Sequence, residues 1–94
     1  MLFRSRALED EFSSVGFSVF PNPISAGEIL SLQTKRPLEA KSEVLIYDAL
    51  GKLRLQLDLP SRQQEISIPV LSMEPGLYFL YVQGLGQGKI VTVY

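Results

Sequence analysis

Residues 44–59 read VLIYDALGKLRLQLDL, two apolar segments joined by a short polar one. In the second segment, Leu53–Leu59, leucines alternate with polar residues, which is the period-two pattern of a strand with one buried face. The first segment, Val44–Tyr47, is apolar throughout and predicts a strand covered on both faces. Asp48 and Gly51 fit the first and fourth positions of a type I turn with a G1 bulge. The stretch predicts a β-hairpin.

Short apolar runs bounded by turn residues continue outward from this hairpin in both directions. Their spacing of about 8–12 residues is typical of an immunoglobulin-like β-sandwich. The fold expected for residues 16–94 is therefore all-β, an immunoglobulin-like β-sandwich of about seven antiparallel strands, with a closed barrel as the alternative. The other predicted strands are Phe17–Phe20, Ile29–Leu32, Ile66–Ile68, Leu77–Val82 and Ile90–Tyr94.

Residues 1–15 differ from the rest of the chain. They are charged, contain serines and show no sustained period, so they are expected to be a linker or tail preceding the domain. Arg6–Phe12 is the only candidate for a short helical turn, and the linker interpretation is preferred there as well. The segment has no apolar h-region and is not a secretory signal peptide. Ser13–Gly16 is small and polar enough to be an accessible cleavage site.

Composition excludes several classes of function. The net charge is −1, from 9 basic and 10 acidic residues, with no basic stripe for nucleic acid or an anionic membrane. No apolar run approaches the roughly 18 residues that a membrane span requires. Cysteine and histidine are absent, which removes thiolate and imidazole chemistry and soft-metal sites.

No catalytic, cofactor-binding or metal-binding residues are predicted. The carboxylates are scattered and are best interpreted as solvated or turn residues, and Asp10, Asp48 and Asp58 lack calcium-loop spacing. The glycine-rich segment Gly84–Gly88 lies between two predicted strands, whereas a phosphate-binding loop opens a helix. The chain is therefore not expected to be an enzyme.

Aromatic residues occur on most of the predicted strands. Because a small domain needs apolar burial, they are expected to fill the core and the strand-rim positions. The alternative is a non-catalytic carbohydrate-binding or adhesion module of a surface protein, in which two or three rings would be exposed. The residues concerned are Phe17, Phe20, Tyr47, Tyr78, Phe79, Tyr81 and Tyr94.

The turn residues follow a recognisable order that covers residues 17–94. The chain resembles the type A C-terminal sorting domain of the type IX secretion system, also called the Por secretion system. Two departures are Phe20, where tyrosine is usual, and the last residue Tyr94, where a basic residue is common. The matching residues are Pro21, Asn22 and Pro23 in the opening motif, Tyr47, Asp48, Gly51 and Lys52 in the central motif, Gly76 and Tyr78 in the late motif, and Lys89, Ile90 and Val91 in the terminal motif.

The resemblance implies an address label for an upstream cargo protein in Bacteroidota. Such a precursor reaches the periplasm, its sorting domain is read by the type IX translocon, and the cargo crosses to the outer-membrane surface or the medium. A sortase-like peptidase usually removes the domain. A plain structural spacer in a surface protein is a further alternative.

The terminal strand is the expected recognition element. If it is an open edge, a partner can pair with it by strand addition, and isolated domains can form strand-paired homodimers. The residues expected to be read are Lys89, Ile90, Val91, Thr92, Val93 and Tyr94.

Overall fold

The computed structural model describes residues 16–70 and 73–94. These residues form seven strands, which confirms the predicted all-β class. The predicted linker, residues 1–15, and the candidate for a helical turn within it lie outside the described residues. The strands are β1 (Phe17–Phe20), β2 (Ile29–Thr34), β3 (Ser42–Asp48), β4 (Leu53–Leu59), β5 (Glu65–Pro69), β6 (Gly76–Val82) and β7 (Gln87–Val93).

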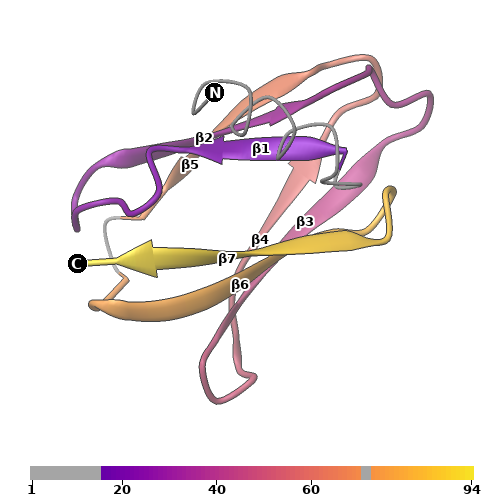
Figure 1. Ribbon diagram of the computed structural model, residues 1–94. Helices are drawn as coiled ribbons and strands as arrows, with labels where there is room; N and C mark the ends of the chain where they lie inside the picture. The colour runs from indigo at the N-terminus through magenta and orange to yellow at the C-terminus, as the bar shows by residue number, and fades with distance from the viewer. Residues whose placement is uncertain (1–15, 71–72) are drawn as a thin grey trace, which may run out of the picture.

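The strands form two layers (Figure 1). One is a three-stranded sheet in the order β1-β2-β5, and the other is a four-stranded sheet in the order β4-β3-β6-β7. Neighbouring strands in both sheets are antiparallel. The β3–β4 hairpin extends beyond the body of the sandwich (Figure 1), and Leu50 at its tip is 94% exposed.

The core lies between the two layers, where alternate residues of each strand face inward. β2 contributes Leu30 and Leu32, and β6 contributes Leu80 and Val82, all with no exposed surface. Burial of such side chains stabilises the fold by about 1.5–3 kcal/mol each. The inward positions follow the period of two that the sequence predicted.

Strand β4 departs from its predicted pattern. Leu59 is fully buried, but Leu53 is 44% exposed. The register shifts between Ile46, which pairs with Leu55, and Tyr47, which pairs with Leu53. This bulge leaves one extra residue on β4 and moves Leu53 to the outer face, because a one-residue slip reverses the side to which a side chain points. The prediction that all four leucines share the core face is wrong at Leu53.

Strand β3 is covered on one face only, so the prediction of burial on both faces is wrong. Val44 and Ile46 are buried, whereas Leu45 and Tyr47 are half-buried. A two-layer sandwich has no third layer to cover its outer faces, so the apolar outer side chains of β3 remain partly accessible.

The aromatic side chains divide between core and surface. Phe17 and Tyr78 are buried as predicted, and the partly exposed Phe20 and Tyr94 lie at strand ends. Phe79 contradicts the prediction, because it lies in the middle of β6 and is 40% exposed. Its neighbours Tyr78 and Leu80 both face inward, so strand alternation directs Phe79 outward.

Candidate functional site

Three of the four motif segments lie side by side at one end of the four-stranded sheet. Asp48 of the central motif is paired with Tyr78 of the late motif, and Tyr78 is paired with Val91 of β7. At the end of the same ladder, Gly76 is paired with Val93. Residues that are distant in the sequence therefore lie side by side on three neighbouring strands.

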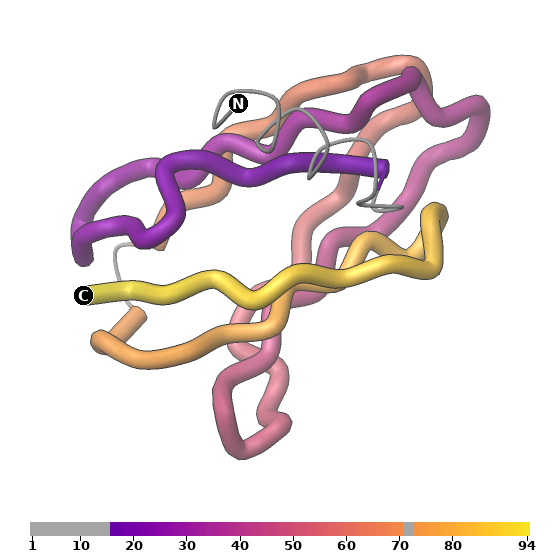
Figure 2. Tube along the Cα trace, in the orientation of Figure 1, coloured from indigo at the N-terminus to yellow at the C-terminus, as the bar shows by residue number. Residues whose placement is uncertain are grey.

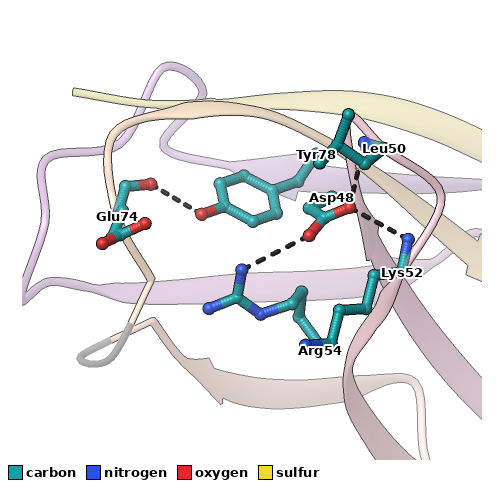
Figure 3. A network of polar contacts seen from close by, with 6 residues as sticks. All are labelled: Asp48, Leu50, Lys52, Arg54, Glu74 and Tyr78. Atoms are coloured by element: carbon teal, nitrogen blue, oxygen red, sulfur yellow. Dashed lines mark hydrogen bonds and ion pairs between the residues drawn. The ribbon is translucent and has the colours of Figure 1, made fainter.

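The central motif makes the β3–β4 turn through the side chain of Asp48 (Figure 3). Its Oδ1 atom accepts hydrogen bonds from the backbone N–H groups of Leu50 and Lys52, both at 2.9 Å. The Gly51 N–H donates to the Asp48 carbonyl at 2.9 Å, and Gly51 has a φ of 86°. The predicted turn closed by a glycine at positive φ is confirmed.

Electrostatic contacts favour the charged form of Asp48. Its Oδ2 atom lies 3.4 Å from Nη1 of Arg54, which the bulge in β4 brings to this side. The backbone hydrogen bond from Lys52, with further contributions from Leu50 and Arg54, lowers the pKa of the Asp48 carboxyl below its usual range. Asp48 therefore acts as a turn former that stays ionised in mild acid.

A shallow hollow of about 200 Å³ separates this turn from the loop before β6. The Tyr78 hydroxyl donates a hydrogen bond to the Glu74 carbonyl at 2.6 Å, which fixes the loop against the core (Figure 3). Arg54 and Glu74 also line the hollow. The central and late motifs thus each stabilise their own loop, and the two loops form opposite sides of the hollow.

The opening motif lies along the outer edge of β7. Asn22 donates from Nδ2 to the Ile90 carbonyl at 3.0 Å, and its Oδ1 accepts from the Thr92 N–H at 3.1 Å. Ile24 continues the pairing, because its N–H donates to the Thr92 carbonyl at 2.8 Å and its carbonyl accepts from the Tyr94 N–H at 2.9 Å. Figure 2 shows this indigo segment turning beside the yellow C-terminal end.

The terminal strand is consequently not an open edge. Ala26 completes the pairing by donating to the Tyr94 carbonyl at 2.9 Å. The prediction of an open β7 edge is wrong from Ile90 to Tyr94, because residues 22–26 already occupy its outward hydrogen-bonding groups. Residues 22–26 are called the edge cap below.

A comparison with protein families gives a match over most of the chain. The model of the secretion system C-terminal sorting domain matches residues 18–93. The chain belongs to this sorting-domain family. A comparison with curated proteins finds no match. The resemblance to the type IX secretion sorting domain is confirmed, and the domain is a C-terminal sorting signal that implies a secretion system and an upstream cargo.

Within the sorting domain, the residues expected to be read have different surroundings. Val91 and Val93 are buried in the core, at 3% and 2% exposure. Ile90 and Tyr94 are exposed, and Lys89 and Thr92 are intermediate. Opposite them, Pro21, Asn22 and Pro23 are all exposed. The available surface of β7 therefore consists of side chains: Ile90 and Thr92 lie on the outer face, and the partly exposed Lys89 lies opposite Leu80 on the other face.

The capping role of Asn22 was missed by sequence reasoning, which treated it as a turn residue of the opening motif. An asparagine amide can donate and accept at the same time, so it can replace one residue of a neighbouring strand. That property was visible in the sequence, but its partner, Ile90, lies 68 residues away along the chain.

Proposed function

We propose that this sorting domain directs an upstream cargo protein through the type IX translocon and is then removed by a sortase-like peptidase. The route passes through the periplasm of a member of the Bacteroidota and ends at the outer-membrane surface or in the medium. The observation that carries this proposal is the convergence of the opening, central, late and terminal motifs at one end of the sheet. Translocon components would recognise this end.

The domain acts as a label without catalytic activity of its own. In support, the sequence has no cysteine or histidine. Across residues 16–70 and 73–94, no group of three or more acidic side chains is placed to hold a metal ion. The same residues contain no helix long and apolar enough to cross a membrane.

An export assay tests the proposal. The complete 94-residue chain is fused behind a signal peptide and a fluorescent passenger in a type IX-competent bacterium. The passenger is expected at the cell surface or in the medium, and it should remain in the periplasm of a strain that lacks the translocon. Equal distribution in both strains would show that the domain does not direct type IX export.

Cleavage is tested in the same cells. The exported passenger should lack the domain, and mass spectrometry of its new C-terminus should locate the cut upstream of β1. Inactivation of the sortase-like peptidase should leave the passenger joined to the domain. Full-length passenger at the surface of wild-type cells would contradict removal while leaving the sorting role in place.

A carbohydrate-binding module is the second candidate, and one observation favours it. The rings of Phe79 and Tyr81 lie on the outer face with centroids 6.4 Å apart and planes 24° apart. Phe79 is exposed and Tyr81 is half-buried, and nearly parallel rings that reach the surface can stack against sugar rings. Glycan-array binding that is lost in Phe79→Ala, together with export of the wild-type fusion that does not depend on the translocon, would favour this function over sorting.

A further inference from the structure

The edge cap restricts how a partner can read β7. The Ile90 carbonyl and the N–H and carbonyl groups of Thr92 and Tyr94 are all engaged by residues 22–26. On the other side, β6 pairs with β7 along its whole length. An added strand would have to displace the cap, and Ile24 in that cap is completely buried. Backbone pairing to this part of β7 is therefore costly.

We propose that the export partner instead recognises the outward side chains of β7. These side chains form one border of an apolar patch on the outer face of the four-stranded sheet. This inference rests on the proposed sorting function. The partner would be a folded protein with a complementary apolar surface, and the edge cap would remain in place during recognition.

The patch is continuous across all four strands. Leu53 is paired with Tyr47, Tyr47 with Phe79, and Phe79 with Ile90. Leu77 lies next to this row on β6. We call these five residues the outer patch. Tyr47 is half-buried, and the exposed fractions of the others are 44% for Leu53, 54% for Leu77, 40% for Phe79 and 56% for Ile90. An exposed apolar surface that extends over several strands is typical of an interaction site.

The centre of the outer patch is held in position before any partner binds. A Cβ atom at Gly88 would lie 2.8 and 2.9 Å from Cε1 and Cε2 of Phe79, so the ring rests on the glycine backbone. Tyr81 stacks beside the same ring. A fixed aromatic side chain loses little conformational entropy on binding and is a common anchor of protein interfaces.

The chemistry of the patch indicates its occupant. None of the outer-patch side chains carries a charge, so a strongly acidic or basic ligand would find no charge complementarity there. The row ends in the aliphatic residues Leu53 and Ile90, whose side chains offer no hydrogen bond to the hydroxyl groups of a sugar. An apolar protein surface fits this composition best, and its contact would include β7, the strand expected to be read.

The proposal is tested with the full-length fusion in the export assay and three substitutions. Ile90→Ser removes a patch side chain. Ile29→Ser is the matched control, because Ile29 on β2 in the other sheet is 60% exposed. Asn22→Ala removes the side-chain part of the edge cap. Thermal unfolding of each purified chain establishes that the variants are folded.

Ile90→Ser is expected to reduce exported passenger about tenfold, which corresponds to losing one modest apolar contact. Ile29→Ser should leave export unchanged, and Asn22→Ala should not increase it. Photo-crosslinking from position 90, but not from position 29, should capture a component of the translocon. Increased export with Asn22→Ala would overturn the proposal in favour of strand addition. Normal export with a folded Ile90→Ser would overturn it by showing that the outer patch is not the recognised surface.

Other occupants give different results. Concentration-dependent sedimentation that disappears in Ile90→Ser would show that a second copy of the domain covers the patch. Glycan binding that disappears in Phe79→Ser would show a sugar ligand. Each result would overturn the proposal. Failure of the wild-type fusion to be exported would instead contradict the sorting function itself, which the variants do not test.

Discussion

At the scale of single residues, the ionisation of Asp48 should make the stability of the fold depend on pH. Hydrogen bonds from Lys52 and Leu50 and the nearby Arg54 lower its pKa in the folded protein below the ordinary value of 3.8. A carboxyl with a depressed pKa stabilises the fold fully above its unfolded-state pKa, and this contribution is lost as the pH falls through the folded-state pKa. The stabilising effect should therefore disappear only in acid, below about pH 4.

We expect Asp48→Asn to make the free energy of unfolding less dependent on pH between about pH 4 and pH 2, because asparagine does not titrate. Urea unfolding of both proteins over this range measures the difference. Asp58→Asn on the same hairpin is the charge-matched control. Parallel pH profiles for wild type and Asp48→Asn would show that the turn does not favour the ionised form.

Gly51 should be sensitive to substitution solely because of its backbone conformation. Its φ is 86°, and a Cβ atom there would meet nothing within 4 Å. Gly51→Ala is expected to destabilise the domain by about 1–2 kcal/mol through the left-handed backbone. Gly51→Asn should cost less, because asparagine tolerates this conformation better. Equal midpoints of urea unfolding for wild type and Gly51→Ala would contradict a left-handed backbone at this position.

At the scale of elements, β4 combines a core strand and a surface strand. Leu59 has no exposed surface, whereas the bulge leaves Leu53 44% exposed. Leu59→Ala should destabilise the domain by about 2–5 kcal/mol. Leu53→Ala should change stability by less than about 1 kcal/mol. Chemical denaturation of the two variants measures both, and similar losses would mean that the whole strand faces the core.

The same elements show which parts of the structure can be predicted from sequence. The strands and the Asp48 turn can be predicted, because the alternation of apolar residues and the turn residues involve positions close together in the sequence. The bulge at Leu53 does not, since it depends on the register between β3 and β4. The edge cap is still harder to predict, because the hydrogen bonds of Asn22 join residues about 70 positions apart. A proline-rich motif indicates a turn but not the strand on which that turn lies.

At the scale of the whole molecule, the terminal strand that we propose as the recognition element is also part of the core. Val91 and Val93 are buried in the core, and β7 holds the edge cap through Ile90, Thr92 and Tyr94. Deletion of residues 89–94 would therefore expose the inward faces of β6 and Ile24 as well as removing part of the proposed recognition surface. Burial of the two valines alone is worth about 3–6 kcal/mol, which is comparable with the total stability of a small domain.

We expect the chain that ends at residue 88 to be largely unfolded at 25 °C, as measured by circular dichroism and amide hydrogen exchange, while Ile90→Ser remains folded. Loss of export on truncation would then reflect loss of the fold, and only substitutions of outward side chains separate recognition from stability. A truncated chain that keeps a cooperative unfolding transition would show that β7 is dispensable for folding. In that case its deletion would be a direct test of the signal.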